Sequence, residues 1–120
     1  MKYEKETVGK IVVVRIQESK LTSHEAPDLK TSLLELIIGD GEYIILNMKN
    51  VEYMDSTGLG GFLFGIRQAE SYDKEIVFCE IKPRIQSLVR IAHLDQVIGI
   101  YKTEKEALKD IQEEETSLES

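Results

Sequence analysis

Residues 54–61, which read Met-Asp-Ser-Thr-Gly-Leu-Gly-Gly, hold the residue types best suited to a binding or modification site. A side-chain oxygen of Asp55 or Ser56 can cap a helix that begins here, because it accepts a hydrogen bond from a free backbone N–H. Capping does not explain the three glycines that follow Thr57. Each glycine costs a helix about 0.5–1 kcal/mol relative to alanine. We therefore expect that something approaches this backbone closely.

A helix over residues 56–72 would turn different residue types to its two sides, at about 100° per residue. One side is apolar and is expected to face the core: Leu59, Phe62, Leu63, Ile66 and Ala69. Gly58, Gly61 and Gly65 border this side, where small residues allow close packing. The opposite side is expected to face solvent: Ser56, Gly60, Phe64 and Arg67. Aromatic and arginine side chains are enriched at interface hot spots, so this opposite side is a candidate partner-binding surface.

Phosphate is a ligand that such a helix start favours, because free N–H groups and the helix dipole attract anions. Two nucleotide-binding motifs nevertheless fail. A dinucleotide fingerprint needs glycine where Leu63 stands, and a P-loop needs Lys-Ser/Thr where Ile66 and Arg67 follow Gly65. We expect no bound cofactor. A covalent phosphate on Ser56 fits better, since it would add about −1.5 to −2 charges at the helix start and alter any interface there.

Strand-like and helix-like periods alternate along the whole chain. Strands are expected at residues 3–7, 11–16, 43–48, 75–81 and 97–101. Helices are expected at residues 56–72, from residue 83 and from residue 103. A further helix is expected to end at residue 38, with Ile37 and Ile38 on its apolar face. That last helix can start at Thr22, which has capping-box spacing to Glu25, or at Pro27. The alternation predicts an α/β domain with a largely parallel central sheet.

Composition excludes several classes of function. The net charge is −7 without a basic cluster, so we expect no nucleic-acid partner and no membrane partner. No apolar run approaches the ~20 residues that span a bilayer, and residues 1–10 do not resemble a signal peptide. His24 and His93 lack ligand-spaced partners, which argues against a metal site, and the single Cys79 is expected to be buried and inert. A cytoplasmic protein without enzymatic activity is expected.

The pattern Val-x-Tyr-x-Asp-Ser-Thr-Gly-Leu-Gly at residues 51–60, after the strand residues 44–47, resembles the signature of the STAS domain in its anti-sigma factor antagonist branch. Ala26-Pro27-x-Leu29 stands where these domains begin their first helix, and Ile81-x-Pro83 looks like their third helix. The resemblance implies a STAS-like fold, with four to five mostly parallel strands and about four helices. Residues 1–120 would form a single STAS domain, whose acidic tail is expected to fray from about residue 114.

The resemblance also implies a partner switch. The unphosphorylated protein would bind an anti-sigma factor that is also a serine kinase, of the histidine-kinase-like ATPase type, and so release the sigma factor. The kinase would phosphorylate Ser56, with Thr57 ranked below it, and a serine phosphatase would reset the switch. The resemblance and the outward side of the helix expected at residues 56–72 together predict the partner-binding residues: Thr22, Asp55, Ser56, Thr57, Gly58, Gly60, Phe64 and Arg67. Many family members carry an aspartate where Thr22 stands here.

Two other functions are compatible with the sequence. A receiver domain phosphorylated on Asp55 would share the length, the α/β alternation and the Lys82-Pro83 pair. Receivers also need an acidic pair after the first core strand to bind Mg²⁺, whereas residues 11–16 read Ile-Val-Val-Val-Arg-Ile, and Lys82-Pro83 comes too early to close a five-stranded receiver. The second is a STAS scaffold module in a non-sigma partner-switching pathway, which the sequence does not separate from sigma control.

Overall fold

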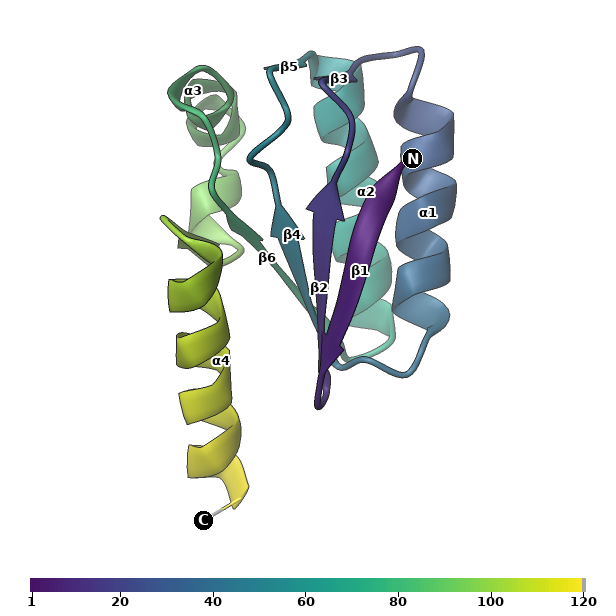
Figure 1. Ribbon diagram of the computed structural model, residues 1–120. Helices are drawn as coiled ribbons and strands as arrows, with labels where there is room; N and C mark the ends of the chain where they lie inside the picture. The colour runs from purple at the N-terminus through teal and green to yellow at the C-terminus, as the bar shows by residue number, and fades with distance from the viewer. Residues whose placement is uncertain (120) are drawn as a thin grey trace.

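A computed structural model describes residues 1–119 of the protein and places a five-stranded sheet at its centre (Figure 1). The strands lie in the order β1 (Tyr3–Val8), β2 (Ile11–Ile16), β4 (Tyr43–Asn47), β6 (Glu75–Cys79) and β7 (Ile100–Tyr101). β1 is antiparallel to β2, and the remaining neighbours pair in parallel. The predicted α/β fold with a mostly parallel sheet is confirmed.

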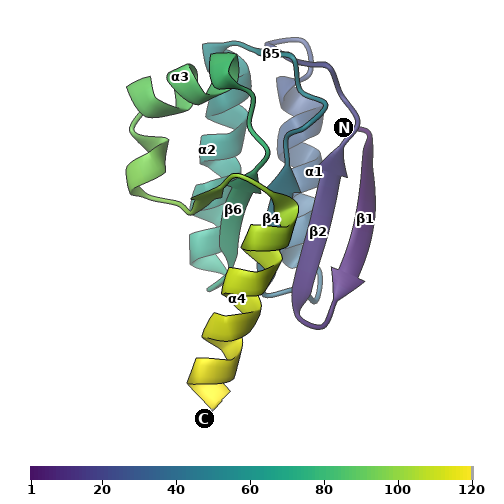
Figure 2. The ribbon, with the colours of Figure 1, turned by 60° about the vertical axis from the view of Figure 1, so that its left-hand side comes forward.

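Helices cover both faces of this sheet (Figures 1 and 2). α1 (Ala26–Ile38) and α2 (Ser56–Ser71) lie side by side on one face, and α3 (Pro83–Ile91) adds Ile85 and Val89 to the same core cluster. α4 (Glu104–Glu119) crosses the other face. Thr103 caps α4, because its hydroxyl accepts a hydrogen bond from the backbone N–H of Glu106 at 3.1 Å. In the described residues, no helix is both long enough and apolar enough to cross a membrane.

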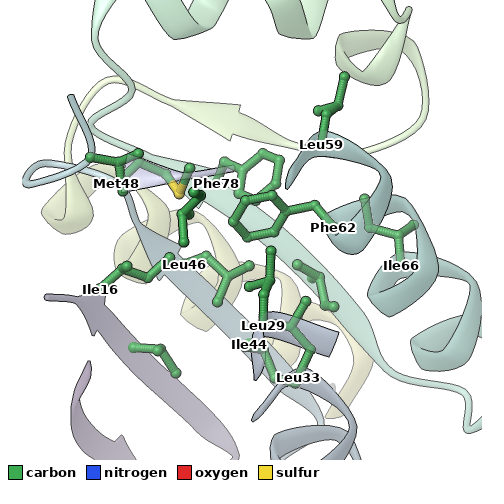
Figure 3. Packing of buried hydrophobic residues seen from close by; sticks show 14 of the residues in the cluster. Ile16, Leu29, Leu33, Ile44, Leu46, Met48, Leu59, Phe62, Ile66 and Phe78 are labelled. Carbon is green, nitrogen blue, oxygen red and sulfur yellow. The ribbon is translucent and has the colours of Figure 1, made fainter. Parts of the chain in front are cut away.

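The β-branched run of β2 is buried on both faces, as its sequence predicts. Val12 and Val14 belong to the larger core cluster under α1 and α2, whereas Ile11 and Val13 pack with the residues that α4 covers. At the centre of the larger cluster, the rings of Phe62 and Phe78 meet edge to face at 5.2 Å (Figure 3). Such pairs contribute about 0.5–1.5 kcal/mol beyond their burial.

Several predicted boundaries are wrong in detail. The strand expected at residues 97–101 is only β7, because the backbone N–H groups of Val97 and Ile98 both donate to the carbonyl oxygen of Leu94 in a short 3-10 helix, η1 (Leu94–Gln96), that precedes it. β6 ends at Cys79, two residues early. Ile38 is 59% exposed, not buried, because the apolar face of α1 is centred on Leu33 and Ile37, and Ile38 is rotated by about 140° from Leu33 and about 100° from Ile37.

The acidic C-terminal segment is helical as far as Glu119, where α4 ends. Residue 120, the last of the predicted tail, lies outside the described residues. Fraying of this segment from about residue 114 stays a prediction, as does the assignment of residues 1–120 to a single domain.

Candidate functional site

A small second sheet fixes the position of the glycine-rich segment. β3 (Lys20–Leu21) pairs in parallel with β5 (Tyr53–Met54), next to the start of α2 (Figure 1). The chain that leads into α1 therefore lies beside the chain that leads into α2. Two-residue strands have no periodicity to detect, so the sequence contains no signal for this pairing.

Asp55 is the cap of α2, which resolves the choice between Asp55 and Ser56. Its Oδ1 accepts a hydrogen bond from the backbone N–H of Gly58 at 2.9 Å, and its Oδ2 accepts one from the backbone N–H of Ser23 at 3.2 Å. Its extended backbone, with φ −104° and ψ −179°, is typical of an N-cap. One carboxylate thus closes the helix and ties it to the turn before α1.

We expect Asp55→Ala to lower the free energy of unfolding by about 1–2 kcal/mol, because two backbone N–H groups lose their acceptor. Urea denaturation followed by circular dichroism measures this loss. Asp40→Ala is the matched control, since Asp40 lies exposed in the loop after α1 and its removal should change stability by less than about 0.5 kcal/mol. Equal effects of the two substitutions would contradict the capping role.

Ser56 and Thr57 occupy the first two positions of α2, and both are exposed. With Asp55 as the cap, neither hydroxyl is needed to close the helix. The helix dipole and the free N–H groups of the first turn favour an anion at this position, whereas the Asp55 carboxylate opposes it. Either hydroxyl is accessible to an external phosphate donor.

Thr22 is engaged at the start of α1. Its backbone N–H and its hydroxyl both donate to Glu25 Oε1, at 2.9 and 2.8 Å, which forms one half of the predicted capping box. These two hydrogen bonds hold the pKa of Glu25 below its usual range, and the bond from the backbone N–H has the larger effect. The helix itself begins at Ala26, with Glu25 as its N-cap and a proline in its first turn, so the predicted start near Pro27 is the correct one. Thr22 precedes Ser23, whose N–H binds Asp55, so it lies at the same end of the molecule as Ser56.

The glycines of α2 fall into two groups. A Cβ on Gly58 would overlap the carbonyl oxygen of Leu21, and one on Gly61 or Gly65 would stand 2.8 Å from Leu29 Cδ2 or 2.7 Å from Leu33 Cδ1. These three glycines therefore let α2 pack closely on β3 and α1, as predicted. A Cβ on Gly60 would meet nothing within 4 Å.

Phe64 and Arg67 continue the outer side of α2 away from Ser56. Arg67 is exposed, as the helical spacing predicts. Phe64 is half-buried, so its predicted exposure to solvent is only partly correct. Lys30 of α1 extends over the Phe64 ring, with its Nζ 5.7 Å from the centroid. Lys30 is a residue that the sequence reasoning missed, because the contact depends on how the two helices pack.

The predicted site residues therefore form two neighbouring groups. Thr22, Asp55, Ser56, Thr57 and Gly58 gather at the start of α2, and Gly60, Phe64 and Arg67 follow along its outer side. Arg67 lies eleven residues after Ser56, or about 16 Å along a helix axis.

Other reactive groups lie elsewhere. Among the side chains that the structure describes, no group of three or more His, Cys, Asp or Glu residues is arranged to hold a metal ion. Cys79 is buried, as predicted, and burial raises the pKa of its thiol to about 12. The thiol is therefore protonated and unreactive at neutral pH.

The chain matches the family model of the STAS domain over residues 2–107. It is 27% identical over 103 residues to the anti-sigma F factor antagonist of Paenibacillus polymyxa, covering 85% of this chain and 87% of the relative. It is 31% identical over 81 residues to the anti-sigma-B factor antagonist of Staphylococcus aureus, covering 68% and 75%.

Solved structures show the same fold. An anti-sigma factor antagonist domain from Planctomyces limnophilus matches with a TM-score of 0.82 at 17% identity, over 92% of this chain and 97% of the other. The Bacillus protein SpoIIAA in its phosphorylated form matches with a TM-score of 0.70 at 23% identity, over 92% and 99%. This chain therefore belongs to the STAS domain family, among relatives that are anti-sigma factor antagonists.

Proposed function

We propose that this chain is an anti-sigma factor antagonist that binds an anti-sigma factor when Ser56 is free and releases it when Ser56 is phosphorylated. The observation that carries the proposal is the exposed Ser56 at the first position of α2, with Asp55 already serving as the cap. The names of the curated relatives support the antagonist role.

A phosphate on Ser56 would change the surface without changing the fold. Ser56 contributes no buried side chain, and the first turn of a helix tolerates an anion well. SpoIIAA, solved in both its unphosphorylated and phosphorylated forms, matches this chain at similar TM-scores of 0.68 and 0.70. The similar matches are consistent with one fold carrying both states.

The partner would lose affinity for an electrostatic reason. Phosphorylation adds about −1.5 to −2 charges beside the Asp55 carboxylate. A partner that desolvates this surface must then bury or repel the added charge, which weakens the complex. The partner itself would be a serine kinase of the histidine-kinase-like ATPase type, and a separate serine phosphatase would restore Ser56.

Catalysis would belong to those partners. His24 lies in the turn before α1, next to Ser23, but in the described residues no hydrogen bond joins it to the Ser56 hydroxyl, and the neighbouring Asp55 already accepts two backbone hydrogen bonds. Ser56 is accordingly a phosphate acceptor and not a nucleophile activated by its own chain. The double engagement of Asp55, together with the antiparallel β1 edge, also argues against a receiver phosphorylated on Asp55.

Substitutions at Ser56 test the switch. We expect Ser56→Ala to retain the anti-sigma factor and Ser56→Asp to lower the affinity at least tenfold. Ser71→Ala, exposed at the far end of α2, is the matched control for binding, and Thr57→Ala should still be phosphorylated. Isothermal titration calorimetry measures binding, and incubation with ATP and the kinase measures phosphorylation. Equal binding by Ser56→Ala and Ser56→Asp would contradict the switch, and a phosphate labile to hydroxylamine would indicate Asp55.

A further inference from the structure

The bare helix backbone at Gly60 is a feature that packing within the chain does not explain. We propose that Gly60 is the floor of a docking point on which the partner bound through Ser56 seats an apolar side chain. This inference rests on the proposed function and adds to it the residue that determines fit.

The other glycines of α2 identify Gly60 by contrast. Gly58, Gly61 and Gly65 each face a neighbouring atom that a Cβ would overlap or crowd. A Cβ built on Gly60 would have no neighbouring atom within 4 Å. Glycine lowers helix stability relative to alanine. At a helical position where a Cβ has space, the stability of the folded chain would therefore favour alanine. Packing within the folded chain therefore does not account for glycine at this position, and we attribute it to a contact with a partner.

The surroundings of Gly60 give the docking point its walls. Residues four apart lie on the same side of a helix, about 6 Å along the axis, so Ser56 borders Gly60 on one side and Phe64 on the other. Phe64 is half-buried, and the Lys30 ammonium lies 5.7 Å from its ring centroid. This cation–π contact holds the ring in place before a partner arrives, which lowers the entropic cost of binding.

Charge and polarity define what fits. The surface between the glycine backbone and the phenyl ring is suited to an apolar side chain of the partner, because apolar anchors at the centre of an interface contribute much of its binding energy. Lys30 and Arg67 are exposed cations at the edge of this surface, although the chain as a whole has a net charge of −7. Carboxylates that surround the apolar side chain of the partner would therefore be complementary to them. A phosphate on Ser56 would stand one helical turn from this apolar contact, which connects the docking point to the switch.

Graded substitutions at Gly60 test the proposal with the purified anti-sigma factor of the same cell. We expect Gly60→Ala to keep or raise the melting temperature while lowering the affinity about threefold, and Gly60→Met to lower it about tenfold. Glu70→Met is the matched control, an exposed position on the same helix about 15 Å further along, and should bind as the wild type does. Titration calorimetry and thermal melts of the same samples provide both readouts.

The outcomes separate this inference from the proposed function. Wild-type affinity in Gly60→Met would overturn the docking point while leaving the Ser56 switch intact. A melting temperature lowered by several degrees in Gly60→Ala would also overturn it, because the glycine would then serve the fold. Failure of the wild-type chain to bind the anti-sigma factor would contradict the proposed function itself.

Discussion

Gly58→Ala is expected to lower the free energy of unfolding by about 3 kcal/mol, a large effect for the addition of one methyl group. The new Cβ would overlap the carbonyl oxygen of Leu21, and neither partner can yield easily. Leu21 is fully buried and pairs with Met54, and its carbonyl accepts the N–H of Asp55 at 3.4 Å. Relief of the overlap would separate β3 from β5. Urea denaturation measures the loss.

Gly60→Ala is the matched control for this prediction, since it makes the same chemical change two residues later on the same helix. Its Cβ has open space, so stability should stay constant or rise by up to about 1 kcal/mol. A similar loss for both variants would show that the contact with Leu21 does not govern the effect, because helix propensity and the unfolded state both favour alanine at a helical position. Backbone NMR shifts in residues 20–24 should change for Gly58→Ala alone.

The fold could be predicted to a large extent because its signals are local. The β-branched run of β2 and the 3.6-residue spacing of Leu29, Leu33 and Ile37 each repeat over enough residues to specify an element. The Asp-Ser-Thr-Gly pattern located the start of α2 and its capping residue within two candidates. Such features depend on neighbours in sequence, and a single chain contains that information.

The candidate site was only partly predictable because its remaining features depend on distant contacts. The pairing of β3 with β5 joins residues 33 apart through two-residue strands, and together with the Ser23–Asp55 hydrogen bond it places Thr22 beside Asp55. The helical spacing placed Gly58 at the packed border and Gly60 on the solvent side, as the structure has them, but it could not identify Leu21 as the neighbour that Gly58 meets. Lys30 likewise contacts Phe64 only once α1 and α2 have packed.

The attachment of α4 is a further long-range feature. Arg15 of β2 donates from Nε and Nη2 to the two carboxylate oxygens of Glu104, at 2.9 and 2.8 Å, across 89 residues of sequence. Glu104 Oε1 also accepts from Asn47 Nδ2 at 3.0 Å, and Arg15 Nη2 also binds Glu6 Oε1 at 2.9 Å. The side chains of Arg15 and Glu104 are only 30% and 18% exposed, so water screens this pair weakly.

Arg15→Met should lower the free energy of unfolding at pH 7 by about 2 kcal/mol, because Glu104 would stay mostly buried without its cation. The hydrogen bonds from Arg15 hold the pKa of Glu104 below its usual range. A carboxylate whose pKa is lower in the folded state stabilises the fold above the unfolded-state pKa of about 4.3, and this contribution disappears as the pH falls through the folded-state value.

The difference in unfolding free energy between the wild type and Arg15→Met should therefore be largest near neutral pH and shrink below about pH 4. Lys10→Met is the matched control, since the Lys10–Glu42 pair spans 3.9 Å with both side chains more than half exposed. Its loss should cost less than about 0.5 kcal/mol. Urea denaturation from pH 3 to pH 8 measures both variants. An Arg15→Met effect that is independent of pH would mean that Arg15 stabilises the fold through its aliphatic packing and not through Glu104.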